Sequence, residues 1–175
     1  FYYEPLIDGQ ELVFLAGGSG ITPFMSMIRG LLGSHPSPAS FEVHLLYGCR
    51  VPEDVIYGGE LARLAAEHPT LHYSLVISEP PADYAGLTGF LTAELIAELV
   101  GDVAGKTFYI CGPNLMQGFC LEALTRLGVP AHKIKKELYG PPDDVTHEPG
   151  WPAGLAATTP FEVNVGGHGT IRAAA

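Results

Sequence analysis

A glycine-rich turn is the first segment of the sequence whose residue types and spacing could do chemistry. Residues 15–23 read Leu-Ala-Gly-Gly-Ser-Gly-Ile-Thr-Pro, between a buried-strand pattern and a helical pattern. Glycines let a ligand approach the backbone closely, and a helix N-terminus offers free N–H groups with partial positive charge. Thr22 is typical of an N-cap and Pro23 suits the first helical position. The segment therefore predicts a binding site for a pyrophosphate. The alternative is a tight strand–helix turn that binds no ligand, because the standard GxGxxG fingerprint is absent.

A second turn, Cys111-Gly112-Pro113, closes another expected strand and precedes another expected helix. In doubly wound sheets, ligands bind at the carboxyl ends of the strands, where the winding direction reverses. With the strand order 3-2-1-4-5, strands one and four are neighbours at that point. The two turns should then face each other across one crevice. Taken alone, Cys111 would be interpreted as a small buried hydrophobic residue.

Two more strand ends carry groups that could contact a cofactor. Gly48-Cys49-Arg50 follows the second expected strand. In folds of this kind, residues at this strand end contact the adenosine ribose. Arg50 could accept a 2′-phosphate, or it could be a solvated surface residue. Glu137 and Tyr139 end the fifth expected strand, where an acid and an aromatic could lie near a redox ring or simply finish a strand.

The elements that must position these groups alternate between short apolar runs and helical patterns. We expect strands at residues 11–16, 41–47, 71–77, 106–111 and 134–139, and helices at residues 22–32, 53–67, 92–100 and 114–127. Such alternation predicts right-handed βαβ crossovers and a parallel sheet. Strands this apolar need cover on both faces. The predicted fold is therefore an α/β, doubly wound, five-stranded parallel sheet of order 3-2-1-4-5 with helices on both faces.

The composition changes after this sheet. Residues 141–160 are rich in Pro, Gly, Ala and Thr and are interpreted as a linker. Residues 161–165 alternate like a strand and are followed by Gly166-Gly167, a turn signal, and by a second short run at residues 170–173. The tail is therefore expected to form a short β-hairpin.

The composition also excludes several classes of protein. The formal net charge of −10 makes nucleic acid an unfavourable partner. The three cysteines contain no CxxC pair and the seven histidines show no ligand spacing, so no metal site is predicted. The odd, widely spaced cysteines argue against a disulfide framework, and we expect a reducing, cytoplasmic compartment. No apolar run is long enough to span a membrane.

Taken jointly, these segments resemble the NAD(P)-binding domain of the ferredoxin–NADP reductase superfamily, and in particular the reductase components of bacterial oxygenases. The resemblance covers roughly residues 10–140. It rests on residues 16–23, residues 46–50 with Glu60-Leu61, residues 89–92, Cys111-Gly112-Pro113 with Met116, and residues 137–139.

The resemblance implies a reductase in which a flavin domain carrying FAD or FMN precedes the dinucleotide domain. Residues 1–9 would then be the trailing edge of that flavin domain. Hydride would pass from NADH or NADPH to the flavin; NADH is preferred because fused iron–sulfur reductases of this kind commonly use it, while Arg50 favours NADPH. The implied catalytic residues are Thr22 and Cys111, bordering the nicotinamide. The implied cofactor-binding residues are Gly17, Gly18, Ser19, Gly20, Ile21, Thr22, Pro23, Gly48, Cys49, Arg50, Cys111, Gly112, Pro113, Met116, Glu137 and Tyr139.

The tail adds a further expectation about partners. Residues 161–173 are similar to the first hairpin of a plant-type 2Fe–2S ferredoxin domain, whose cluster ligands would follow Ala175. An iron–sulfur acceptor, either a ferredoxin domain or an oxygenase component, would then receive single electrons from the flavin. Two alternatives stay open: a dinucleotide-binding electron-transfer or regulatory subunit of a larger redox complex, and a nucleotide-binding fold that has lost catalysis.

Overall fold

A parallel sheet forms the centre of the first of two units, Phe1–Tyr139 and Gly140–Ala175, into which the chain divides. The computed structural model describes residues 1–34, 41–138, 145–147, 150–156, 158–165 and 169–173. In the first unit the strands are β1 (Glu11–Gly17), β2 (Glu42–Cys49), β3 (Leu71–Ile77), β4 (Leu87–Thr88), β5 (Thr107–Gly112) and β6 (Ile134–Leu138). The helices are α1 (Pro5–Asp8), α2 (Ile21–Ser34), α3 (Gly58–Glu67), α4 (Ala93–Val100) and α5 (Asn114–Arg126), with 3-10 turns η1 (Gly18–Gly20), η3 (Pro52–Asp54) and η4 (Ala131–Lys133).

The strand order is β4-β3-β2-β1-β5-β6, and every neighbouring pair is parallel. The five predicted strands are present in the predicted order, so the predicted fold class is confirmed. The sixth strand, β4, was not predicted. It is two residues long and pairs with the carboxyl end of β3, which is too short a segment to show any periodicity.

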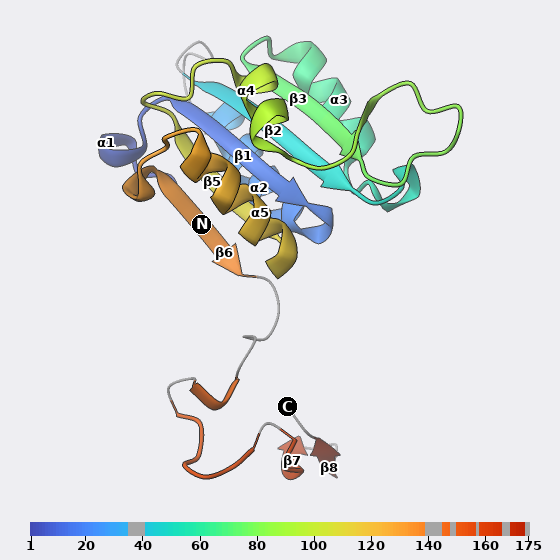
Figure 1. The fold of residues 1–175 in the computed structure, drawn as a ribbon, viewed down its shortest axis with the longest axis vertical. Helices are drawn as coiled ribbons and strands as arrows, with labels where there is room; N and C mark the ends of the chain where they lie inside the picture. The colour runs from blue at the N-terminus through green and yellow to red at the C-terminus, as the bar shows by residue number, and fades with distance from the viewer. Residues whose placement is uncertain (35–40, 139–144, 148–149, 157, 166–168, 174–175) are drawn as a thin grey trace. The chain divides into compact units, whose positions relative to one another are not determined.

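Alternate strand residues enter two separate cores, one on each face of the sheet. Leu12 and Phe14 of β1 pack with α2 and α3, whereas Val13 and Leu15 pack with α4 and α5. This is the period-two alternation of a strand buried on both faces. Figure 1 shows α4 and α5 on one side of the sheet and α2 on the other. Among the described residues, no helix is both long and apolar enough to cross a membrane.

The helix predicted at residues 53–67 is shorter than expected. The chain forms η3, then passes through Tyr57 with φ of +59°, and only then begins α3 at Gly58. A left-handed residue cannot continue a right-handed helix, so the two turns are separate elements. The prediction for residues 53–57 was wrong because the apolar spacing there does not reveal this break.

The second unit contains a hairpin of β7 (Phe161–Val165) and β8 (Gly169–Ala173), paired antiparallel as predicted. The expected turn at Gly166-Gly167 lies outside the described residues. In the described residues of the stretch 141–160, expected to be a linker, the secondary structure consists of short turns, among them η5 (Val145–His147). The assignment of residues 161–175 to a further domain stays a prediction.

The segment before β1 is anchored to the sheet through Asp8. This carboxylate is fully buried and lies 2.6 Å from the Lys135 ammonium of β6. It also accepts hydrogen bonds from the Tyr109 hydroxyl at 2.7 Å and from the Glu4 amide at 2.7 Å. Burial raises the pKa of Asp8, but the hydrogen bonds from Lys135, Glu4 and Tyr109 outweigh it and leave this pKa below its usual value.

Replacing Asp8 with alanine should lower the free energy of unfolding by about 2–4 kcal/mol, because it leaves a partly buried ammonium without its counter-charge. The measurement is urea unfolding at pH 7. The exposed Asp83 provides the control, since Asp83→Ala should change the free energy by less than about 0.5 kcal/mol. Because the folded-state pKa of Asp8 is depressed, its contribution is complete above the unfolded pKa and is lost as pH falls through the folded pKa. A difference between wild type and Asp8→Ala that grows in acid would contradict this account.

Candidate functional site

The glycine-rich turn follows β1, where the buried strand passes into η1 and then α2. Gly18 has φ of +51°, a left-handed conformation that side chains with a Cβ rarely adopt, and a Cβ there would meet no atom within 4 Å. Its carbonyl oxygen accepts a hydrogen bond from the Tyr47 hydroxyl at 2.9 Å. The same hydroxyl accepts one from the Ile56 amide at 3.2 Å, and burial raises the pKa of Tyr47. Tyr47 of β2 thus fixes the turn while the backbone at Gly18 stays open.

Helix α2 begins earlier than predicted. It starts at Ile21, so Thr22 and Pro23 are its second and third residues, and their predicted N-cap and first-position roles are wrong. The exposed Thr22 hydroxyl donates a hydrogen bond to the Ser19 carbonyl oxygen at 2.8 Å. Thr22 therefore stabilises the passage from η1 into α2 instead of capping the helix.

The two predicted turns meet at the carboxyl ends of β1 and β5, where Ala16 pairs with Cys111. A methyl group on Gly20 would overlap the carbonyl oxygen of Cys111, and one on Gly112 would come within 3.1 Å of the Gly17 backbone. Only residues without a Cβ allow backbones to approach this closely. The two turns therefore meet where the strand order predicted that they would.

Gln117 of α5 holds the second turn in place. Its buried side-chain amide donates hydrogen bonds to the carbonyl oxygen of Gly112 at 3.0 Å and to that of Glu137 at 2.8 Å. One side chain thus ties the end of β5 to the end of β6. Met116, one residue earlier, places its sulfur against Gly17 and Gly112.

A groove of about 430 Å³ opens along this edge of the sheet. It is lined by residues from the carboxyl ends of β1, β2, β3 and β5 and from the segment between β4 and α4: Gly17, Gly18, Ser19, Gly48, Cys49, Arg50, Asp54, Ser78, Gly89, Phe90, Leu91, Pro113 and Met116. One wall carries Phe90, whose side chain is 67% exposed. An exposed aromatic ring at a groove is a surface on which a flat ligand ring can stack.

Arg50 is the cationic side chain among the residues that line the groove. Its guanidinium lies 3.3 Å from a carboxylate oxygen of Glu79 and 3.8 Å from one of Asp54. All three side chains are about half exposed or more. Arg50 is therefore already paired with two negative charges at the end of β2.

Eight predicted binding residues line the groove and seven do not. Those that line it are Gly17, Gly18, Ser19, Gly48, Cys49, Arg50, Pro113 and Met116. Those that do not are Gly20, Ile21, Thr22, Pro23, Cys111, Gly112 and Glu137. Gly20 and Gly112 instead permit the contact between the turns, and Ile21, the first residue of α2, is buried in the core.

Cys111 and Glu137 lie side by side in the β5–β6 register, away from the groove lining. The Cys111 side chain is fully buried, and burial raises the pKa of its thiol to about 11, with the Glu137 carboxylate adding to the shift. The thiol is therefore protonated near neutral pH. Glu137 is partly exposed, and Tyr139 lies outside the described residues.

Sequence reasoning missed Asp54, Ser78, Gly89, Phe90 and Leu91 as groove residues. Ser78 directly follows β3, so the rule that ligands lie at carboxyl ends could have found it. Asp54 follows Arg50 by four residues, in η3. The other three residues are brought to the groove by β4, whose pairing gave no signal, although the Gly89 amide donates to the Ile77 carbonyl oxygen at 2.9 Å.

An open parallel sheet whose glycine turn and Cys-Gly-Pro turn meet over its carboxyl edge defines a dinucleotide-binding α/β domain. The family model of the oxidoreductase NAD-binding domain matches residues 14–122, which is more than half of the chain. The chain belongs to this family. The match and the structural neighbours confirm the resemblance to the NAD(P)-binding domain of the ferredoxin–NADP reductase superfamily.

Several known proteins are similar to the chain. The flavohemoprotein of Rhodopirellula baltica is 29% identical over 83% of the chain and 36% of its own length. A component of the Na⁺-translocating NADH-quinone reductase of Pseudomonas aeruginosa is 33% identical over 74% of the chain and 33% of its own length. The solved flavohem-like FAD/NAD-binding domain of nitric oxide dioxygenase from Vibrio cholerae superposes with a TM-score of 0.67 and 27% identity, over 81% of the chain and 54% of that structure. The chain thus spans about a third of the length of the first two relatives.

Gly20 lies at the contact between the two turns and Gly30 does not, so alanine at these two positions should change the free energy of unfolding in opposite directions. Gly20→Ala should lower the free energy of unfolding by about 1–3 kcal/mol, because its methyl group would overlap a backbone atom that cannot move aside cheaply. Gly30→Ala, in the exposed part of α2 with no atom within 4 Å, should raise it by about 0.5–1 kcal/mol. Denaturant unfolding measures both. Equal changes in the free energy of unfolding for the two variants would contradict the close approach of the two turns at Gly20.

Proposed function

We propose that this chain binds NADH and forms the dinucleotide-binding half of a flavin-dependent reductase. The observation that carries the proposal is the groove at the meeting of the two turns, which the open backbone of Gly18 helps to line. Its volume of about 430 Å³ lies within the range of about 300–1,000 Å³ that ligand sites occupy. The missing Cβ at Gly18 leaves space for a phosphate group to reach the backbone.

Each part of the dinucleotide would be held by a different strand end. Gly18 and Ser19, with the N-terminus of α2, would bind the pyrophosphate through backbone N–H groups. The adenosine end would lie over Cys49 and Arg50, and the nicotinamide end toward Pro113 and Met116. This assignment follows the rule for the switch point of doubly wound sheets.

Thr22 and Cys111, predicted to border the nicotinamide, do not line the groove, so they would act by positioning the turns and would take no part in proton transfer. Cys111 has a buried, protonated thiol, and its carbonyl oxygen contacts Gly20, so it would act by positioning the two turns. Thr22 would keep Ser19 in place through its hydrogen bond. Hydride transfer needs aligned rings and excluded water, and no general acid or base from this chain.

The charges around Arg50 favour NADH over NADPH. Glu79 and Asp54 already neutralise the guanidinium, and their carboxylates would repel a 2′-phosphate. A carboxylate at this point is also the group that hydrogen-bonds a free ribose 2′-hydroxyl in many NAD-binding sheets. The Pseudomonas relative, a component of an NADH-quinone reductase, supports the same choice.

When bound, NADH supplies a hydride, which a flavin in a neighbouring domain would accept and release as single electrons. The Vibrio cholerae neighbour, an FAD/NAD-binding domain, supports FAD as that flavin. We place residues 1–9 at the junction with the flavin domain, and Glu137 on the side facing it. The acceptor after the flavin would be an iron–sulfur centre, on the basis of the β7–β8 hairpin and its similarity to the start of a 2Fe–2S ferredoxin domain.

Replacing Gly18 with valine should weaken NADH binding roughly tenfold or more, because its side chain would fill the space left for the phosphate. Calorimetry with NADH, and separately with ADP-ribose, provides the measurement. Gly105→Val is the matched control, since Gly105 has φ of +77°, also has no atom within 4 Å, and lies before β5 at the opposite end of the sheet. Similar NADH affinity in the two variants would remove the glycine turn from the site.

The double substitution Asp54→Asn with Glu79→Gln should raise the affinity for NADPH relative to NADH by roughly three- to tenfold, because it removes the two charges that oppose a 2′-phosphate. Glu98→Gln with Asp102→Asn, on and after α4, makes the same change in net charge away from the groove. The ratio of the two dissociation constants is the readout. An unchanged ratio in the first double variant would exclude these carboxylates as the source of selectivity.

A further inference from the structure

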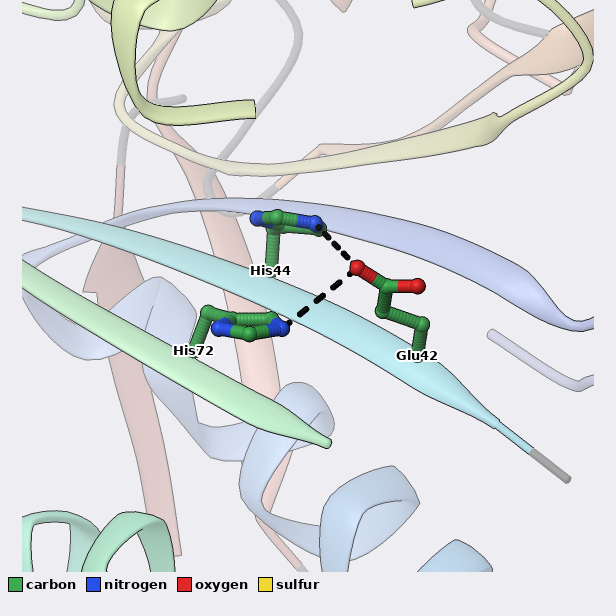
Figure 2. Close-up of side chains that lie close together, drawn as sticks. All are labelled: Glu42, His44 and His72. Atoms are coloured by element: carbon green, nitrogen blue, oxygen red, sulfur yellow. Dashed lines mark ion pairs between the residues drawn. The ribbon is translucent and has the colours of Figure 1, made fainter. Parts of the chain in front are cut away.

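A second cluster of chemical groups lies at the amino end of the sheet, far along the strands from the groove. It consists of Glu42 and His44 of β2 and His72 of β3. Parallel pairing places His44 directly opposite His72, and Glu42 precedes His44 by two residues, so all three side chains stand on the same face. Figure 2 shows both imidazole rings directed toward one oxygen of the Glu42 carboxylate.

The three ligand atoms are close enough to share one ion. The Nε2 atoms of His44 and His72 each lie 3.4 Å from Oε1 of Glu42. The two rings are stacked, with centroids 4.5 Å apart and planes inclined by 23°. One ligand atom from each residue lies within 4.8 Å of the others.

The Nε2 atom of His44 is the unusual feature of the cluster. The residue is buried, with a relative exposure of 7%, and its Nε2 makes no hydrogen bond. Buried polar atoms are normally paired, and one that is not calls for an explanation such as an ion. The nearest acceptor, Glu42 Oε1, is at a distance at which the two atoms could be neighbouring ligands of a metal.

We propose that Glu42, His44 and His72 form a binding site for a divalent transition-metal ion, with Zn²⁺ as its representative. Zinc binds histidine nitrogen at about 2.0–2.1 Å and carboxylate oxygen at about 2.0–2.2 Å in a tetrahedron, which places neighbouring ligand atoms about 3.3–3.5 Å apart. The two observed nitrogen–oxygen distances of 3.4 Å agree with this spacing. Two imidazoles and one carboxylate are also a donor set that zinc prefers over Ca²⁺ or Mg²⁺.

The surroundings suit a cation. Glu42 and His72 are each 46% exposed, so solvent can reach the fourth position of a tetrahedral ion. The nearby ammonium of Lys106 is paired with Glu11 at 3.1 Å, which offsets its repulsion of a metal.

The site would join β2 to β3 at the end of the sheet opposite the groove. The spacing of histidines along the chain gives no sign of it, because His44 and His72 come from different strands and meet only through their register. It uses no residue of the proposed dinucleotide site. Metal binding and NADH binding can therefore be tested independently.

The test is a titration of the untagged 175-residue chain with Zn²⁺ against a chromogenic chelator. One equivalent should bind, and Zn²⁺ should raise the thermal midpoint. His72→Ala should weaken this binding by at least about tenfold, since even the loss of a group that supports a ligand costs about 10–100-fold. His132→Ala is the matched control, because His132 is also exposed and lies on η4 outside the cluster.

Glu42→Gln provides a second variant that keeps the size of the side chain, in case His72→Ala disturbs the sheet. It should also lose at least about tenfold in Zn²⁺ affinity while its far-ultraviolet circular dichroism stays unchanged. X-ray absorption of the zinc-loaded chain should show two imidazole ligands. The absence of stoichiometric binding, or equal Zn²⁺ affinity in wild type, His72→Ala and Glu42→Gln, would overturn the proposal, whatever the result with NADH.

Discussion

The backbone contact between two turns is the constraint on which the rest of the structure depends. Gly20 touches the carbonyl oxygen of Cys111, and Gly17 lies against Gly112, so neither turn has room for a Cβ at these points. This contact fixes β1 against β5 at their carboxyl ends and leaves a groove above them. Tyr47 and Gln117, both buried through most of their surface, hold the two turns from either side. The groove therefore results from the packing of the two turns against each other at the ends of the buried, apolar strands.

Parallel pairing also explains why two chemically different sites can form on the same strands. The carboxyl end of β2 presents Cys49 and Arg50 to the groove, while its amino end presents Glu42 and His44 to the neighbouring strand. All strands of this sheet point the same way, so each end of the sheet brings together side chains from several segments. The two ends differ in their charged groups. Arg50 is neutralised by carboxylates beside the groove, whereas at the other end a buried imidazole nitrogen of His44 makes no hydrogen bond and lies 3.4 Å from the Glu42 carboxylate.

The strand order, both helical layers and the meeting of the turns could be predicted, because buried strands and glycine turns leave strong local signals. Other features could not. β4 is too short for periodicity, so Phe90 was not expected at the groove. Tyr57 interrupts the predicted helix because its φ is positive, and the spacing of apolar residues along the chain does not reveal this angle. Glu79 meets Arg50, and His44 meets His72, only because β2 and β3 pair in a particular register. The order of residues along the chain does not specify this register.

The central claim is that the glycine turn holds a pyrophosphate where it meets the Cys-Gly-Pro turn. A crystal structure of the chain with bound NADH tests it most directly. The account predicts pyrophosphate oxygens within hydrogen-bond distance of the Gly18 and Ser19 amides, with the adenosine over Cys49 and the nicotinamide toward Pro113. A pyrophosphate bound at another edge of the sheet, with this groove left to solvent, would contradict it.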